Sequence, residues 1–266
     1  MLLIALSLGA FICLTLALTG AGGGIMAVPA LTLGLGLSMT QASPIALLTV
    51  ASAASIGMLS GLRLGLVRFR AALLISLVGI LAAPFGQQLA QLLPERTLIF
   101  LFASVMLLVA VRLFSCSRQS PNTTQRPEKT CLINSQTGRI NWNIASFLKL
   151  CFIGLMSGIS TGLLGVGGGF IVVPALLRYS NISMNGIIAT SLMVITLVSC
   201  GAVISAATMG NLSLNEATSL FIGGAAAGML LGRSLAGKIP AAYLQRGFAI
   251  LITLTSIILY YKVLFR

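Results

Sequence analysis

Long apolar runs, separated by short polar or basic breaks, dominate the chain. Eight of these runs approach the roughly 20 apolar residues that a helix needs to cross a bilayer. They cover residues 2–19, 42–62, 71–93, 97–114, 145–164, 187–209, 217–236 and 241–261. Residues 115–143 are polar and contain Pro121 and Pro127, which predicts a solvent-exposed linker. The pattern therefore predicts an all-α, polytopic integral membrane protein with about 8 transmembrane helices.

The same motif occurs on both sides of this linker. Gly20-Ala-Gly-Gly-Gly24 followed by Val28-Pro-Ala-Leu31 recurs 145 positions later as Gly165-Val-Gly-Gly-Gly169 followed by Val173-Pro-Ala-Leu176. The same shift maps Gly65 onto Gly210. This duplication predicts two homologous repeats of four to five helical elements, residues 1–114 and 144–266. Repeats of this kind are common in secondary transporters, where the substrate lies near the membrane midplane between them.

Each glycine cluster predicts a break in a helix. Glycine has no side chain, costs about 1 kcal/mol relative to Ala within a helix, and favours turns. The apolar segments that follow, 28–37 and 173–179, are short, because ten residues at about 1.5 Å each reach only half of a ~30 Å hydrocarbon core. We therefore expect a half-helix in each repeat. Pro29 and Pro174 are expected in the first turns, where the missing proline N–H has no partner in the helix.

A half-helix that begins inside the membrane presents unpaired amides and the positive end of its dipole, which suits an anion. Two such ends related by a pseudo-twofold axis would face one shared cavity. The alternative is that the glycines only permit close packing of helices. The substrate-binding residues predicted at these ends are Gly22, Gly23, Gly24, Pro29, Gly167, Gly168, Gly169 and Pro174.

Composition and charge support a membrane location. Hydrophobic residues make up 58% of the chain and charged residues 7%, which excludes a soluble globular fold. The formal charge is +13, from 16 Lys and Arg against 3 Asp and Glu. The basic residues gather in 63–70 and in or near the linker, as cytoplasmic loops do under the positive-inside rule. We expect a multi-pass protein of the inner cell membrane with a cytoplasmic linker, and no basic stripe with stacking aromatics points to nucleic acid.

The missing residue types narrow the chemistry. The chain has no His and no Asp, and its carboxylates are Glu95, Glu128 and Glu216. General acid–base catalysis and divalent-metal sites usually need these residue types, so neither an enzyme nor a metal or cofactor site is expected. Carriers of cations and protons usually keep acidic residues within the membrane. Their absence from the apolar runs favours a small anion as the substrate.

Polar residues near the glycine motifs are weaker candidates. Their hydroxyl and amide groups could complete the hydrogen bonds of an anion, or could serve as helix caps and interhelical bonds. These residues are Gln41 in the first repeat and Asn185, Thr190 and Ser191 in the second. Two ladders of glycines at four-residue spacing are expected to pack helices closely: Gly57, Gly61 and Gly65, and Gly224, Gly228 and Gly232.

The doubled motif resembles that of the sulfite exporter TauE/SafE family, also called the sulfonate uptake permease family. The resemblance rests on Gly20-x-Gly22-Gly-Gly24-x-x-x-Val28-Pro29-x-Leu31 and on the copy Gly165-x-Gly167-Gly-Gly169-x-x-x-Val173-Pro174-x-Leu176, and it covers nearly the whole chain. It implies an integral membrane transporter for sulfite, sulfonates or related sulfur-containing or organic anions. Only the glycine and proline positions of the motif carry over as site residues.

Several alternatives stay open at this point. A non-transporting membrane scaffold would use the glycine faces as interaction surfaces, and a carrier of a neutral or cationic metabolite would share the broken helices. The repeats are parallel if each half-helix forms one broken span with the run before it, and inverted if the two cross separately. The direction of transport and the formation of a homo-oligomer are open as well.

Overall fold

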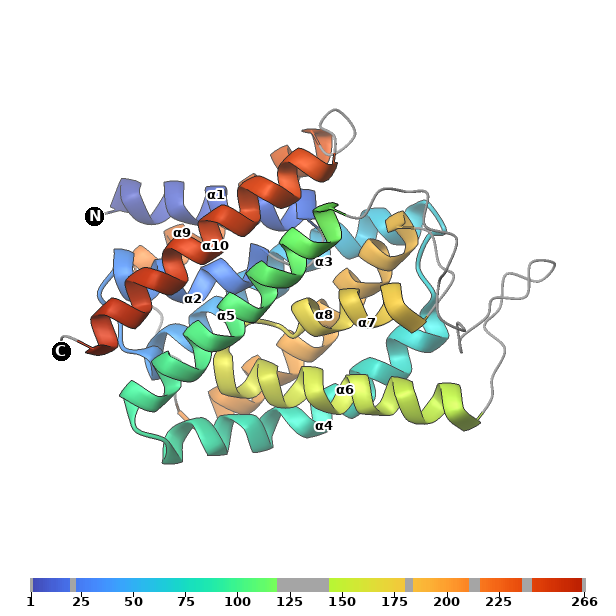
Figure 1. Ribbon diagram of the computed structural model, residues 1–266, viewed down its shortest axis with the longest axis horizontal. Helices are drawn as coiled ribbons and strands as arrows, with labels where there is room; N and C mark the ends of the chain where they lie inside the picture. The colour runs from blue at the N-terminus through green and yellow to red at the C-terminus, as the bar shows by residue number, and fades with distance from the viewer. Residues whose placement is uncertain are drawn as a thin grey trace.

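The computed structural model describes residues 2–19, 23–118, 144–179, 184–210, 216–235 and 241–264. Every regular element among these residues is helical, and the helices form one bundle (Figure 1). The first half contains α1 (Leu2–Thr19), η1 (Gly23–Met26), α2 (Ala27–Pro29), η2 (Ala30–Gly34), α3 (Met39–Arg63), α4 (Phe69–Leu92) and α5 (Glu95–Arg118). The second half contains α6 (Ile144–Leu164), α7 (Gly169–Tyr179), α8 (Met184–Thr208), α9 (Glu216–Leu235) and α10 (Ala241–Leu264).

Each predicted apolar run corresponds to one of the longer helices, which confirms the all-helical fold class. The short elements η1 to η2 and α7 follow the two glycine motifs. Four helices of the described chain are long and apolar enough to cross a membrane: Met39–Arg63, Phe69–Leu92, Ile144–Leu164 and Asn185–Thr208.

Helices α3 and α8 pack against each other and run in opposite directions. Near the end of α3, a Cβ placed on Gly61 would lie 2.9 Å from the Cβ of Ala189, near the start of α8. At the other end of the pair, Pro44 of α3 and Ala206 of α8 line the same cavity. The two halves of the chain therefore meet along an antiparallel helix pair.

Two further pairs join the halves through glycines, and in both pairs the helices run in the same direction. On α9, Gly224 and Gly228 lie against the backbone carbonyls of Leu6 and Ala10 of α1. On α6, Gly158 lies against the carbonyl of Gly79 of α4. The packing role predicted for the second glycine ladder is thus confirmed, because a larger side chain would keep these backbones apart.

Helices α5 and α10 form an antiparallel pair. The hydroxyls of Ser104 and Tyr260 are 2.6 Å apart, and the Phe100 and Tyr260 rings meet edge to face with centroids 5.3 Å apart. Further along the pair, Ser256 Oγ donates a hydrogen bond to the carbonyl of Ala103 at 2.9 Å. Ser104, Ser256 and Tyr260 thus find their hydrogen-bond partners within the helix pair.

The outer faces of the helices are apolar. On α4, the side chains of Leu77, Leu81 and Phe85 are 63%, 65% and 69% exposed. Such large apolar side chains gathered on a helix surface are costly in water but favourable against lipid tails. The chain is a membrane-embedded helical protein.

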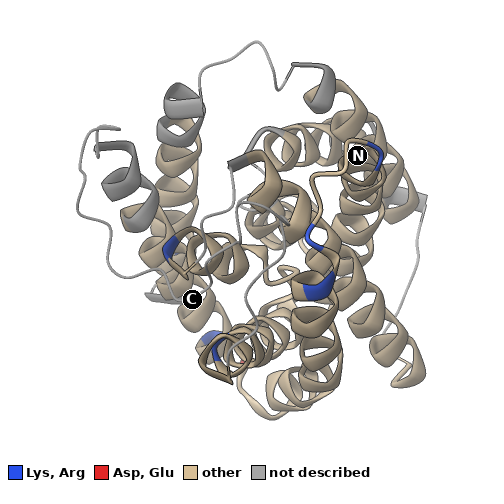
Figure 2. Cartoon of the chain, turned by 90° about the vertical axis from the view of Figure 1, so that its right-hand side faces the viewer, with Lys and Arg blue, Asp and Glu red and all other residues tan. Residues whose placement is uncertain are grey.

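The two ends of the bundle differ in charge. Both termini lie at one end, and the turn between α3 and α4 lies at the other (Figure 1). The latter end, which faces the viewer in Figure 2, holds most of the basic side chains that the structure describes. These are Arg63, Arg68, Arg70, Lys149 and Arg178. The end that holds both termini carries Arg96 and Lys262 among the described basic residues, together with the acidic Glu95.

Candidate functional site

The turn between α6 and α7 has a backbone that favours glycine. Gly165, Gly167 and Gly168 have φ angles of +72°, +76° and +67°. L-residues with side chains pay an energetic cost in this left-handed region, and glycine does not. The amide of Gly165 still donates to the carbonyl of Thr161 at 2.9 Å, which ends α6. The predicted glycine break is therefore confirmed in the second half of the chain.

Helix α7 starts directly at this turn. The amides of Ile171 and Val172 both donate to the carbonyl of Gly168, at 3.1 and 3.3 Å. The preceding amides, those of Gly169 and Phe170, come before the first hydrogen bond inside α7 and so point out of its N-terminus. The turn therefore presents the positive end of the α7 dipole together with its amides.

The prolines do not occupy first turns as expected. Pro174 lies inside α7, which already begins at Gly169, and Pro29 ends α2, which follows the short helix that begins at Gly23. The expectation was wrong because glycines of both clusters adopt helical conformations and extend the helices upstream. Each proline therefore removes an interior hydrogen bond from its helix.

The two glycine segments meet in the middle of the bundle. A Cβ on Gly24 would lie 3.0 Å from the carbonyl oxygen of Val166, and 3.4 Å from a methyl group of Val50. A Cβ on Gly167 would lie 3.2 Å from the other methyl group of Val50 and 3.2 Å from Ile195. Val50 and Ile195 are near the middle of α3 and α8. Residue Gly22 lies outside the described residues, and Gly23 begins η1.

Three hydroxyls from two helices surround the second turn. Ser157 Oγ of α6 donates to the carbonyl of Gly168 at 3.4 Å, and Thr161 Oγ1 donates to the carbonyl of Ser157 at 2.6 Å. Ser199 Oγ of α8 is buried, has no hydrogen-bond partner, and would lie 2.9 Å from a Cβ on Gly167. A buried hydroxyl without a partner is costly unless a ligand or water satisfies it.

The sequence analysis did not predict these three hydroxyls as site residues. The available signal was the four-residue spacing of Ser157 and Thr161, which puts both on one face of an apolar helix. Ser199 had no signal of its own, because only the packing of α8 against the turn brings it there.

The four polar candidates of the sequence analysis lie elsewhere. Gln41 and Asn185 are exposed in the first turns of α3 and α8, hence at opposite ends of the antiparallel pair. Thr190 Oγ1 donates to the carbonyl of Gly186 at 2.6 Å and accepts the backbone N–H of Arg68 at 3.1 Å. Ser191 Oγ donates to the carbonyl of Ile188 at 2.9 Å. The structure does not gather these side chains around the glycine turns.

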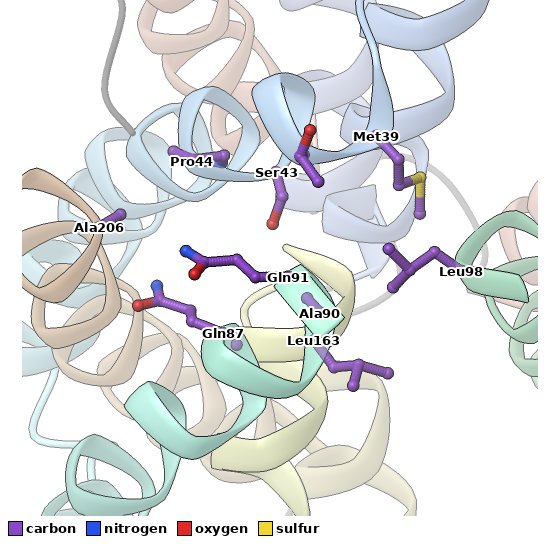
Figure 3. Close-up of a pocket in the computed structure, with 11 residues that line it drawn as sticks. Met39, Ser43, Pro44, Gln87, Ala90, Gln91, Leu98, Leu163 and Ala206 are labelled. Atoms are coloured by element: carbon purple, nitrogen blue, oxygen red, sulfur yellow. The ribbon is translucent and has the colours of Figure 1, made fainter. Parts of the chain in front are cut away.

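A cavity of about 80 Å³ lies between helices of both halves, near the end of the bundle that holds both termini. Figure 3 shows the side chain of Ser43 reaching from α3 toward Gln91 of α4. Gln87, also on α4, lies below Gln91 in this view. Ser43 also packs directly against Gly165, so the cavity adjoins the glycine turn. The lining residues are Met39, Thr40, Ser43, Pro44, Gln87, Ala90, Gln91, Leu98, Gly162, Leu163 and Ala206.

None of these lining residues is charged. Beside the cavity, the backbone N–H of Met39 donates to Glu95 Oε1 at 3.1 Å, so a carboxylate occupies part of the α3 N-terminus. Gln87 and Gln91 were not predicted as site residues. Two glutamines four residues apart at the end of an apolar run were the signal that could have found them.

Comparison with known proteins identifies the family. The family model described as "Sulfite exporter TauE/SafE" matches residues 5–259. The chain belongs to the sulfite exporter TauE/SafE family. This TauE/SafE chain is 24% identical over 263 residues to a "Probable membrane transporter protein" of Xylella fastidiosa (strain 9a5c), covering 96% of this chain and 94% of the relative. A protein of the same description from strain Temecula1 / ATCC 700964 is 25% identical over 266 residues, with 96% and 94% covered. No solved structure matches the chain.

The TauE/SafE match confirms the resemblance seen in the doubled glycine–proline motif. It spans both halves of the chain and so includes both glycine motifs and the cavity beside Gly165. The protein is a member of a membrane transporter family, and its membrane-embedded helices agree with that membership.

Proposed function

We propose that this TauE/SafE protein is a secondary carrier of a small anion, with sulfite, sulfonates and related sulfur-containing or organic anions as the candidate substrates. The family description and the transporter names of the two relatives support carriage. The single observation that carries the anion assignment is the glycine turn at Gly167 and Gly168, with the α7 N-terminus and a buried, unpartnered Ser199 hydroxyl beside it.

The turn offers what an anion needs without a permanent countercharge. Backbone amides and the positive end of a helix dipole stabilise negative charge, and hydroxyls add directed hydrogen bonds. In this proposal the substrate contacts Gly22, Gly23 and Gly24 from one half and Gly167, Gly168 and Gly169 from the other. An anion held by neutral groups binds with modest affinity and is released readily, as a carrier requires.

The helix directions support two inverted repeats. Helices α3 and α8 occupy equivalent positions in the two halves and run antiparallel, as do α5 and α10. Lys149, near the start of α6, lies 5.2 Å from the ring centre of Tyr179 at the end of α7, so α7 runs back alongside α6. Five elements of alternating direction in each half would invert the second half. The proposed transport motion is then a rocking of one repeat against the other around the contact between Gly24 and the turn at Val166.

The charge difference between the ends supports one orientation. Under the positive-inside rule, the basic end of the bundle, with the linker 115–143, faces the cytoplasm of a cell with this protein in its inner membrane. Both termini and the cavity lined by Ser43 and Gln87 then face the outside.

Vesicles reconstituted with purified protein and loaded with labelled sulfite test the proposal. We expect faster efflux than from protein-free vesicles, accelerated further by an inside-negative potential if the anion moves alone. Sulfonates and amino acids serve as competitors to separate an anion carrier from a carrier of other metabolites. No efflux of any tested anion above the control would contradict the proposed function.

A further inference from the structure

The cavity lined by residues of α3, α4, α5, α6 and α8 contains a second group of polar side chains, apart from those at the glycine turn between α6 and α7. Its mouth is polar, with the exposed side chains of Thr40 and Gln91, and its inner end includes the buried residues Gln87 and Gly162. Helices of both halves contribute to it, which is the location expected for a substrate path between repeats.

Gln87 is held in one amide orientation. Its side chain is only 8% exposed, and its Nε2 donates to the carbonyl of Ala202 on α8 at 2.7 Å. A backbone carbonyl only accepts hydrogen bonds, so the nitrogen must face Ala202 and the oxygen must point elsewhere. That oxygen, Gln87 Oε1, is buried without a hydrogen-bond partner.

A buried acceptor without a donor costs about 1–3 kcal/mol, and a ligand that supplies the donor removes this cost. A fully deprotonated oxyanion supplies only acceptors and would repel Gln87 Oε1. The other polar groups at the cavity, the Ser43 and Thr40 hydroxyls and the Gln91 amide, can donate to negatively charged oxygens. The lining thus suits a ligand that is both anionic and a hydrogen-bond donor.

The charges around the cavity also favour a singly charged ligand. Helices α3, α4, α6 and α8 present no charged side chain to it among the described lining residues, and α5 brings Glu95 beside it, with Arg96 next in sequence. Glu95 Oε1 already accepts a hydrogen bond from the backbone N–H of Met39, so the carboxylate partly neutralises the positive end of the α3 dipole. A singly charged anion is therefore favoured over a doubly charged one.

We propose that this cavity binds a singly charged oxyanion that keeps one acidic proton, whose O–H donates to Gln87 Oε1 while its other oxygens accept from Ser43, Thr40 and Gln91. For the sulfur oxyanions this is hydrogen sulfite rather than the sulfite dianion or a sulfonate without a proton. The inference rests on the proposed anion carriage and specifies the form of the substrate. The proton then travels on the substrate, so no titrating side chain is needed to carry it.

Methanesulfonate provides the test, because it carries the same single negative charge as hydrogen sulfite but has a methyl group and no O–H to donate. Sites built to bind a substrate hydroxyl reject analogues that lack it by large factors. In reconstituted vesicles at mildly acidic pH, we expect hydrogen sulfite to exceed methanesulfonate in transport on the order of 100-fold. At constant total sulfite, the transport rate should fall as the pH rises, because the substrate loses its proton. The fall should be the same in the wild type and in Glu95→Gln.

The variant Gln87→Leu should bring the ratio between the two substrates close to one. Gln88→Leu is the matched control, because Gln88 is the exposed neighbour on α4 and does not line the cavity, and its ratio should equal that of the wild type. The wild-type ratio alone tests the inference if Gln87→Leu fails to fold. Equal transport of methanesulfonate, or an unchanged ratio in folded Gln87→Leu, would overturn the inference and leave anion carriage intact. Transport of neither anion would instead reject the proposed function.

Discussion

A Cβ placed on Gly24 would lie 3.0 Å from the carbonyl oxygen of Val166, so the first glycine segment touches the second at the level of Val50. Real Cβ atoms rarely approach other atoms this closely, and a valine at position 24 would push the two segments apart. The contact joins η1 of the first half to the turn between α6 and α7 of the second half. Substitutions around this contact therefore test packing and function together.

Gly168→Val should abolish transport and destabilise the protein. A side chain there would collide with Ser157 and Thr161, and φ at this position is +67°. The collision and the backbone cost together should lower the free energy of unfolding by on the order of 3 kcal/mol, measured by thermal melting in detergent. Gly65→Val is the control, because its φ is +64° but nothing lies within 4 Å of an added Cβ. Equal losses in both variants would show that the packing at Gly168 is unimportant.

Ser199→Ala should reduce transport without destabilising the fold. Its hydroxyl is buried without a partner, so removal costs no hydrogen bond and could raise stability by up to about 1 kcal/mol. The comparison is Ser256→Ala, which removes a buried hydroxyl bonded to the carbonyl of Ala103 and lies on α10. That variant should lose about 1 kcal/mol of stability and keep transport. Undiminished transport by Ser199→Ala would remove this hydroxyl from the site.

Single cysteines should report the orientation of the bundle. Leu64 and Leu92 are 67% and 81% exposed and lie at opposite ends. In a variant without the native cysteines, an impermeant maleimide added to intact cells should label Leu92→Cys, and should label Leu64→Cys only after permeabilisation. Cysteines at Asn122 and Gln136 of the linker should behave like Leu64→Cys. The reverse pattern would invert the proposed topology.

Gly158→Val should separate α4 from α6. An added Cβ would meet the carbonyl of Gly79 and lie 2.7 Å from its Cα, so the helices must move apart, at a cost typically of about 1–3 kcal/mol. Gly223→Ala on α9 is the control, because nothing lies within 4 Å of its added Cβ. Alanine there should stabilise the helix by up to about 1 kcal/mol. Melting temperatures of the two purified variants, compared with the wild type, measure the difference.

The positions of the helices and their breaks follow from the sequence. Long apolar runs predict α3, α4, α6 and α8, because backbone groups in lipid must be satisfied within the helix. The second glycine cluster forms the predicted turn before a short helix. Gly169, the last glycine of this cluster, is nevertheless the first residue of α7, so Pro174 lies in the helix interior and the prediction of a first-turn proline was wrong.

The partners of each helix, and with them the composition of the site, were decided by the tertiary structure. An apolar sequence shows that a segment avoids water. Lipid and a neighbouring helix are equally suitable surroundings for such a segment, so the sequence pattern does not identify which helices pack together. The antiparallel contact of α3 with α8 separates Gln41 from Asn185, and it brings Ser199 to the glycine turn. Where α4 contacts α8, Gln87 Nε2 donates to the carbonyl of Ala202, and Gln87 Oε1 is left without a hydrogen-bond partner. Hydrogen bonds and close contacts of this kind depend on distances between residues far apart in the chain, which no local pattern specifies.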